Sequence, residues 1–412
     1  MAFLKTPMGR LLALLAVLGP GLIAAAADND PGGITTYSVV GAQFGYSFLW
    51  IILLVTVALA ITQEMGARAG IATGKGLASL IRERFGVRWT AVALLATLFA
   101  NLGTTVMEFA GIAAGLELFG VSRYISIPVS ALLIFFLVTR GNYKRVERIF
   151  LGFSVIYLSY IASGLLAQPD WGEVLKGTFV PSFQFDNSDF VLAFIATVGT
   201  TITPWGQFFI QSYVVDKRIS PDKLNQERAD IYIGSVFMGV VAAFIIIACA
   251  ATLFVNGLEV SEAQDAALAL GPLAGRFAEA LFGLGLLNAG LLSAAILPMS
   301  SAYIMCEGLG FEAGIDRSIR EARWFYGLLA FFIVFGAGVV LLNVPLVTVA
   351  LFSQTVNAIF LTPILIFLLK LTNNEEVMDK YTNGPVFKII AGATIVFLIL
   401  LSILLIVTTF GS

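Results

Sequence analysis

Residues 28–33 read DNDPGG, and they interrupt what would otherwise be one long apolar segment. Apolar residues dominate on both sides, in LLALLAVLGPGLIAAAA before the interruption (11–27) and ITTYSVVGAQFGYSFLW after it (34–50). Carboxylates are expensive in such a segment, and where they occur they usually serve a function. Proline removes a backbone donor and glycine loosens the chain, so we expect a helix to break within this stretch.

The composition indicates an all-α integral membrane protein. Of the 412 residues, 58% are hydrophobic and only 12% are charged, and the mean hydropathy is +0.93. A soluble domain carries about 25% charged residues, so this chain has too little polar surface to solvate a globule of its size. Helices satisfy their own backbone groups, as hydrocarbon requires. The net charge of −2 gives no reason to expect a nucleic-acid partner.

The sequence contains no histidine. This excludes imidazole as a metal ligand, a catalytic base or a proton relay. Cys249 and Cys306 lie in or at the end of apolar runs, as small core residues do. Any ion site must therefore use oxygen, sulfur or backbone ligands, and we expect neither an enzyme nor a bound cofactor.

Runs of about 18 or more apolar residues predict eleven membrane-spanning helices. They lie at about 11–42, 46–67, 89–118, 124–140, 148–167, 188–215, 230–255, 272–306, 323–342, 346–370 and 386–410. The first and the sixth are interrupted.

The positions of Lys and Arg support this number of helices. With the N-terminus inside, 21 of the 24 basic residues fall in loops on the cytoplasmic side, and only Arg123, Lys176 and Arg276 fall outside. Cytoplasmic loops are enriched in Lys and Arg, and one missed helix would scramble this division. We therefore expect a multi-pass protein with a cytoplasmic N-terminus and an external C-terminus.

The sixth span contains a second interruption, TVGTTITPWGQFF at 197–209, with Pro204 at its centre. Interrupted helices at matching positions of two five-helix halves are typical of inverted-repeat transporters. We expect the halves at 1–169 and 170–370, followed by a last helix within 371–412. A single proline kink needs no ligand, but two in register, one with an acid, favour an oxygen-lined cation site between them.

Several motifs resemble the Nramp family of divalent metal transporters. They are GPGLIAAAADNDPGG (19–33), VGAQFGYSFLW (40–50), GARAGIATGKGLA (66–78), MEFAG (107–111) and SQTVNAIFLTPILIFLL (353–369). The resemblance covers most of the chain. It implies a LeuT-like fold with eleven helices, alternating access, and a place in the plasma membrane.

The departures from the family pattern lie at positions that would determine which ion is bound. The family's manganese and iron transporters have DPGN in helix one and MPH in helix six, where this chain has Gly33 in place of the Asn, and Thr203 and Trp205 in place of the Met and His. Loss of the soft thioether removes a preference for transition metals. A larger, all-oxygen site suits Mg²⁺, which keeps several waters. The pattern resembles the prokaryotic Nramp-related magnesium transporters, so we expect Mg²⁺ as the substrate, with Mn²⁺ also accepted.

Proton coupling is also affected. Family members use the first acid, histidines in helix six and acids in helix three for proton flow, and only Asp30 and Glu108 remain here. Thr105 stands where many members have Asp. The resemblance therefore implies uncoupled import, with Glu108 as a remnant of the proton path. The alternative is a proton-coupled Mn²⁺ or Fe²⁺ transporter.

The resemblance also implies the ligands. Asp30 is the central one, the carbonyl groups of Ala27 and Thr200 are the backbone ligands, and the Thr203 hydroxyl group would contact ion-bound water. Further candidates are Gln354, Asn357, Asp28 and Gly33, the last by enlarging the site. Asn357 follows Gln354 by three residues, on the same helix face.

Other readings of the sequence fit less well. An amino-acid transporter of the same fold usually lacks an acid at the break in helix one. A sensor or scaffold would be expected to carry a soluble domain. Glu64 and Arg68 have the spacing of an ion pair near a helix end. We expect divalent cations and the lipid bilayer as the partners of a monomer.

Overall fold

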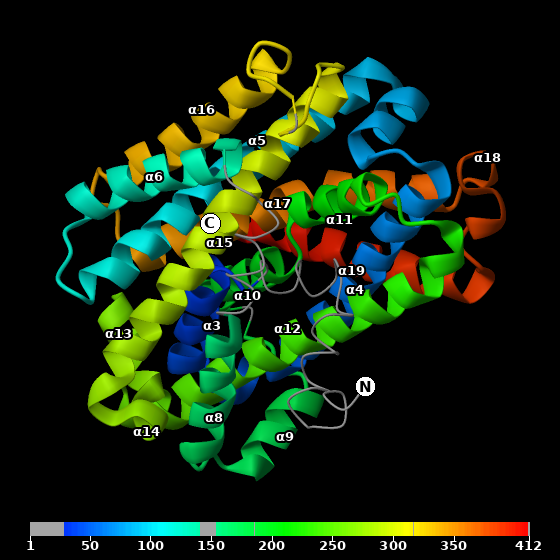
Figure 1. The fold of residues 1–412 in the computed structure, drawn as a ribbon. Coiled ribbons are helices and arrows are strands. Elements are labelled where there is room, and N and C mark those ends of the chain that lie inside the picture. Colours follow the sequence, from blue (N-terminus) through cyan, green and yellow to red (C-terminus); the bar gives the residue numbers. More distant parts are fainter. Residues whose placement is uncertain (1–28, 141–153, 185, 316, 411–412) are drawn as a thin grey trace, which may run out of the picture.

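The computed structural model describes residues 29–140, 154–184, 186–315 and 317–410, and within these residues all regular elements are helices (Figure 1). The first half of the first predicted span lies outside the described residues, and so does the start of the fifth. Among the site candidates, Ala27 and Asp28 lie outside them as well.

The helices match the predicted spans closely. They are α3 (Pro31–Phe44), α4 (Leu49–Thr73), α5 (Leu77–Glu117), α6 (Arg123–Arg140), α8 (Leu158–Leu166), α9 (Trp171–Phe179), α10 (Ser188–Thr201), α11 (Pro204–Asp216), α12 (Leu224–Thr252), α13 (Ala263–Ala267), α14 (Gly271–Ala274), α15 (Ala278–Leu309), α16 (Arg323–Val340), α17 (Leu346–Thr372), α18 (Glu375–Met378) and α19 (Pro385–Phe410). Single 3₁₀ turns join several of them, for example at Gly45–Phe48. The break predicted in the sixth span is confirmed, because α10 and α11 are separate helices.

The start of α5 differs from the prediction of a span beginning near residue 89. The helix begins at Leu77 and bends at Gly86, whose φ of 79° and ψ of 177° are not helical. A positive φ favours glycine, since a side chain would be strained there. The short stretch 77–85 therefore has its own direction, and the long buried part of α5 follows it.

Helix α3 lies among the other helices, in contact with α5, α10, α12 and α17 (Figure 1). Small residues permit these close contacts, as is common between membrane helices. A side chain at Gly41 would collide with Ile246 of α12, and one at Gly111 of α5 would collide with Pro31. At Gly199 of α10 it would collide with the α17 backbone at Gln354. Helices α3 and α10 thus pack against each other and against α17.

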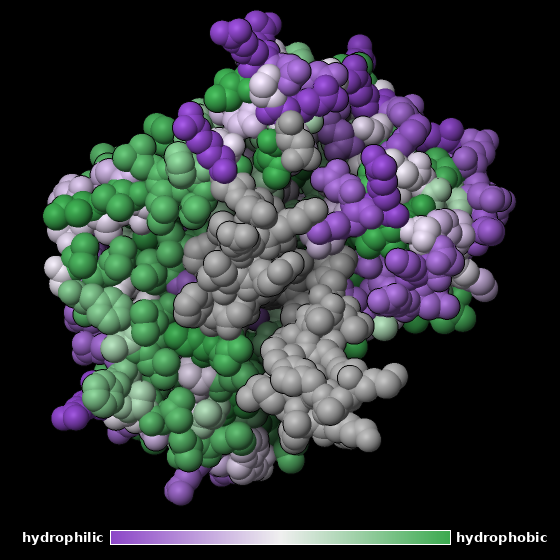
Figure 2. All heavy atoms as spheres, in the orientation of Figure 1, coloured by the Kyte–Doolittle hydropathy of each residue, from purple (hydrophilic) through white to green (hydrophobic). Residues whose placement is uncertain are grey.

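The surface is that of a membrane protein. Seven helical stretches of the described residues are long and apolar enough to cross a bilayer. Exposed apolar side chains cover α6, namely Tyr124, Ile125, Val129, Leu132, Leu133 and Phe136. Figure 2 shows hydrophobic side chains over this part of the molecule, while hydrophilic ones gather around α18 and the beginning of α5.

Glu64 and Arg68 do form an ion pair, with 2.9 Å between Arg68 Nε and Glu64 Oε1, but it is not a helix-end pair. Both side chains are buried within α4, and Arg228 of α12 pairs with the same carboxylate at 2.8 Å. Arg68 also donates to the backbone carbonyl group of Tyr381 and to the Asn383 side chain. The spacing predicted the pair, but only packing of distant segments buries it.

Candidate ion-binding site

Helices α3 and α11 begin in the same way. Asp30 caps α3, whose first residue is Pro31, and the Gly33 amide donates to Asp30 Oδ1 at 2.6 Å. Thr203 caps α11, whose first residue is Pro204, and the Gly206 amide donates to Thr203 Oγ1 at 3.3 Å. A polar cap followed by proline is a favourable start for a helix. Each of these two helices therefore starts with a polar capping side chain in extended backbone, followed by proline.

The end of α10 supplies free carbonyl groups. The last carbonyl groups of a helix have no intrahelical donor, and Thr200 lies in the last turn of α10. Its side chain is fully buried, and its hydroxyl oxygen has no hydrogen-bond partner in the part of the chain that the structure describes. This part of the break offers oxygen atoms to a cation.

Gln354 of α17 reaches the start of α3. A Cβ atom placed on Gly32 would collide with Gln354 Nε2 and would lie 3.1 Å from Asp30 Oδ1, so the amide and the carboxylate converge on this glycine. Gln354 is fully buried, and its Nε2 atom has no hydrogen-bond partner among the described residues. A buried amide without a partner is costly unless a ligand or water completes it.

The orientation of Gln354 is set by its neighbours. Asn357 Nδ2 donates to Gln354 Oε1 at 2.8 Å and to Thr104 Oγ1 of α5 at 2.9 Å. The Thr104 hydroxyl group donates to the Ala100 carbonyl group at 3.1 Å. In this arrangement the Asn357 amide connects α5 to Gln354. Thr104 was missed from the sequence, although it lies one turn before Glu108 on the same face of α5.

Glu108 lies beside Asp30. The two carboxyl groups lie close enough to interact electrostatically. Glu108 is fully buried, and no N–H group of the described residues donates to its oxygens. Two carboxyl groups this close need a shared proton or a bound cation between them. The sequence predicted Glu108 near the ion path, and the fold brings it to the first break.

Residues 21–408 match the family model described as natural resistance-associated macrophage protein-like, or Nramp. The chain belongs to the Nramp family. It is 30% identical over 409 residues to the divalent metal cation transporter MntH of Bacillus subtilis, a match that covers 96% of this chain and 93% of that protein. It is 29% identical to the MntH protein of Yersinia pestis, over 96% of this chain and 95% of that one.

Solved structures show the same fold. A manganese transporter of Eremococcus coleocola superposes with a TM-score of 0.77 at 22% identity, covering 98% of this chain and 89% of that one. The structure of MhsT in complex with L-phenylalanine gives a TM-score of 0.62 at 17% identity, over 93% of this chain and 98% of that one. The predicted LeuT-like, all-helical fold is thus confirmed for this Nramp chain.

The remaining predicted residues of the Nramp site have these positions. Gly33 is buried and donates its amide to Asp30. Trp205 is buried, and its ring packs edge-on against Phe209 with 5.6 Å between ring centroids. Thr105 turns back to the Asn101 carbonyl group, to which its hydroxyl group donates at 2.7 Å.

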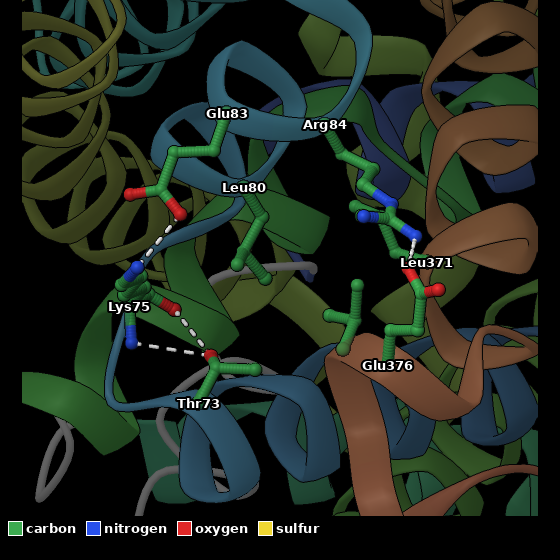
Figure 3. Close-up of a pocket in the computed structure, with 8 residues that line it drawn as sticks. Thr73, Lys75, Leu80, Glu83, Arg84, Leu371 and Glu376 are labelled. Atoms are coloured by element: carbon green, nitrogen blue, oxygen red, sulfur yellow. Dashed lines mark hydrogen bonds and ion pairs between the residues drawn. The ribbon is translucent and has the colours of Figure 1, made fainter.

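A separate cavity of about 360 Å³ lies between the start of α5 and the end of α17 (Figure 3). Its charged side chains form two ion pairs, Lys75 with Glu83 at 2.6 Å and Arg84 with Glu376. None of the predicted ligands that the structure describes lines it. The cavity is therefore distinct from the two helix breaks.

Proposed function

We propose that this Nramp protein moves divalent metal cations across a membrane by alternating access, with the cation held between the two helix breaks. The observation that carries this proposal is the buried carboxylate of Asp30 at the start of α3, on which the Gln354 side chain of α17 converges. Glu108 adds a second carboxyl group. Such a site offers negative charge and oxygen atoms in a nearly dry place, which suits a cation.

Mn²⁺ is the substrate that the comparisons favour. The matched solved structure is named a manganese transporter, and the curated relatives are named divalent metal cation transporters. These names support the alternative substrate over Mg²⁺, the substrate expected first from the sequence. We therefore propose Mn²⁺ transport as the activity to test first.

Mg²⁺ transport is the second candidate, and it is favoured by the donor chemistry of the breaks. Thr203 presents a hydroxyl group where the family's manganese transporters have a thioether, and Asp30 presents a carboxylate. Oxygen-only sites suit hard cations that keep water. Membership of the Nramp-related magnesium branch is part of this second proposal.

We also propose that transport is uncoupled from protons. The chain has no histidine, and Thr105 has a hydroxyl group bonded to its own helix in place of an acid. A divalent ion moving inward gains about 4.6 kcal/mol per 100 mV, so the membrane potential alone can drive uptake. The proposed orientation has a cytoplasmic N-terminus in the plasma membrane of a prokaryote.

The proposed halves, 1–169 and 170–370, followed by 371–412, are supported by the matching breaks. In both, a capping side chain accepts from the amide of the residue three positions later, and proline begins the helix. Equivalent caps in two halves are what an inverted repeat would produce.

Uptake by liposomes that contain the purified protein tests these proposals. We expect Mn²⁺ to enter, Mg²⁺ to enter or compete, and Asp30→Ala to abolish uptake, because the central charge is lost. Asp189→Ala, which removes an exposed acid at the start of α10, should retain uptake. A pH-sensitive dye inside the liposomes reports coupling.

Three outcomes would each contradict one of these proposals. Normal Mn²⁺ uptake by Asp30→Ala would refute the site. Mg²⁺ that neither enters nor competes would refute the second substrate. Acidification of the interior together with Mn²⁺ entry would refute uncoupled transport and favour the proton-coupled alternative.

A further inference from the structure

A polar stripe runs along α11 away from the second break. Thr203, Gln207 and Gln211 are spaced four residues apart, so they lie on one face of the helix. This face packs against α4: a Cβ atom on Gly66 would contact the Gln207 carbonyl group, and one on Gly70 would contact Gln211. All three side chains are buried. The stripe therefore lies inside the protein, at the contact between α4 and α11.

The Gln207 side chain is buried without a hydrogen bond to any described residue. Neither its Oε1 nor its Nε2 atom is bonded within the described ranges, although the side chain is fully buried. An unpaired buried amide destabilises the folded protein, so packing alone would favour an apolar residue such as leucine at this position. Helical side chains point back toward the N-terminus of their helix, which directs this amide toward Thr203 and the break.

Gln211 continues the stripe to the cavity of Figure 3. Its Nε2 atom donates to the Lys75 carbonyl group at 2.9 Å, and its Oε1 atom is buried without a partner. Lys75 lines the cavity together with Glu83 and Glu376 (Figure 3). Unpaired amide oxygens thus lie along α11 between Thr203 and a cavity whose two carboxylates are paired with Lys75 and Arg84.

We propose that Gln207 and Gln211 form a second cation site, a release station for a partly hydrated divalent cation between the Asp30 site and the cavity. This inference rests on the proposed function. Neutral amide oxygens can replace some water ligands of the ion but hold it weakly, and an ion in transit must be able to leave each site. The ion and its water molecules then supply the missing partners of the unpaired amide atoms.

Two substitutions of Gln207 test the station in the liposome assay and by calorimetry. Gln207→Leu should lower the maximal rate of Mn²⁺ uptake by about tenfold and change KM by less than about twofold, since release is slowed while the Asp30 site is intact. Gln207→Glu should strengthen ion binding at this second site enough to be measured, so that the detergent-purified protein binds two Mn²⁺ ions and not one. Ser212→Ala, on another face of α11, is the matched control and should behave as wild type.

The outcomes separate this inference from the proposed function. A wild-type maximal rate in Gln207→Leu, or single-ion binding by folded Gln207→Glu, would refute the station while transport and the Asp30 site stand. Absence of uptake in the wild-type protein would refute the proposed function itself. Gel filtration and thermal melting of each variant show whether it is folded. If Gln207→Glu is not folded, the uptake rate of Gln207→Leu alone tests the second cation site.

Discussion

At the scale of single residues, the site depends on which atoms of a few side chains face each other. Asp30 caps its helix and also faces Glu108, so one carboxyl group has a structural and an electrostatic role. Gln354 is oriented by Asn357, which is held in turn by Thr104. Removal of Thr104, the residue of this hydrogen-bonded series farthest from the ion, should weaken ion binding without removing a ligand.

Thr104→Val tests the hydrogen bonds that run from Thr104 through Asn357 to Gln354. Valine keeps the shape of threonine but cannot accept from Asn357, so the orientation of Gln354 is no longer fixed. We expect a loss of about 1 kcal/mol, or roughly fivefold in the Kd for Mn²⁺ measured by calorimetry. Thr97→Val is the control, because the Thr97 hydroxyl group bonds only to the Ala93 carbonyl group of its own helix. Equal affinities of the two variants would contradict this role.

At the scale of helices, small residues determine how the broken segments approach their neighbours. Gly199 is the closest case, since its Cα faces the backbone of α17 at Gln354 and Ala358. This contact lies one residue before Thr200 and at Gln354 itself, so it involves the neighbourhood of two predicted site residues. Helix packing and site geometry are therefore coupled at this position.

Gly199→Ala should disturb both the packing of α10 on α17 and the geometry of the ion site. The added methyl group overlaps with α17 backbone that cannot move cheaply, and overpacking of this kind costs about 1–3 kcal/mol. We expect a lower thermal midpoint in detergent and slower Mn²⁺ uptake. Gly327→Ala in α16, where a Cβ atom would meet nothing, should melt like the wild type. An unchanged midpoint for Gly199→Ala would show that the α10–α17 contact is looser than described.

At the scale of the whole molecule, a buried charged network connects segments far apart in the chain. Glu64 and Arg68 of α4 join Arg228 of α12 and the residues before α19. The Arg68 guanidinium group also lies 5.2 Å from the centre of the Phe387 ring. These contacts hold α4, α12 and the beginning of α19 together.

Glu64→Gln should strongly destabilise the protein. It leaves the Arg68 charge buried without its carboxylate, a change that costs about 3–5 kcal/mol in buried pairs. We expect a clear fall in the thermal midpoint in detergent. Glu173→Gln breaks the exposed pair with Lys176 in α9 and should change the midpoint little. Similar midpoints for both variants would contradict the importance of burial.

The sequence by itself determined the membrane class, nearly all helix positions within the described residues, and the break in the sixth span. These features are local: apolar run length specifies a membrane helix, and proline with glycine ends one wherever it lies. The sequence also identified Asp30, Glu108 and Gln354 as candidates through residue type and family resemblance.

Only the tertiary structure decided which of these side chains meet. The contact of Asp30 with Glu108, the approach of Gln354 to Gly32, and the links from Thr104 through Asn357 all join helices that are distant in the chain. The unpaired amide of Gln207 and the burial of Glu64 with Arg68 also emerged only there. The reason is physical: hydropathy and backbone breaks act locally, whereas pairing and burial depend on how whole helices pack.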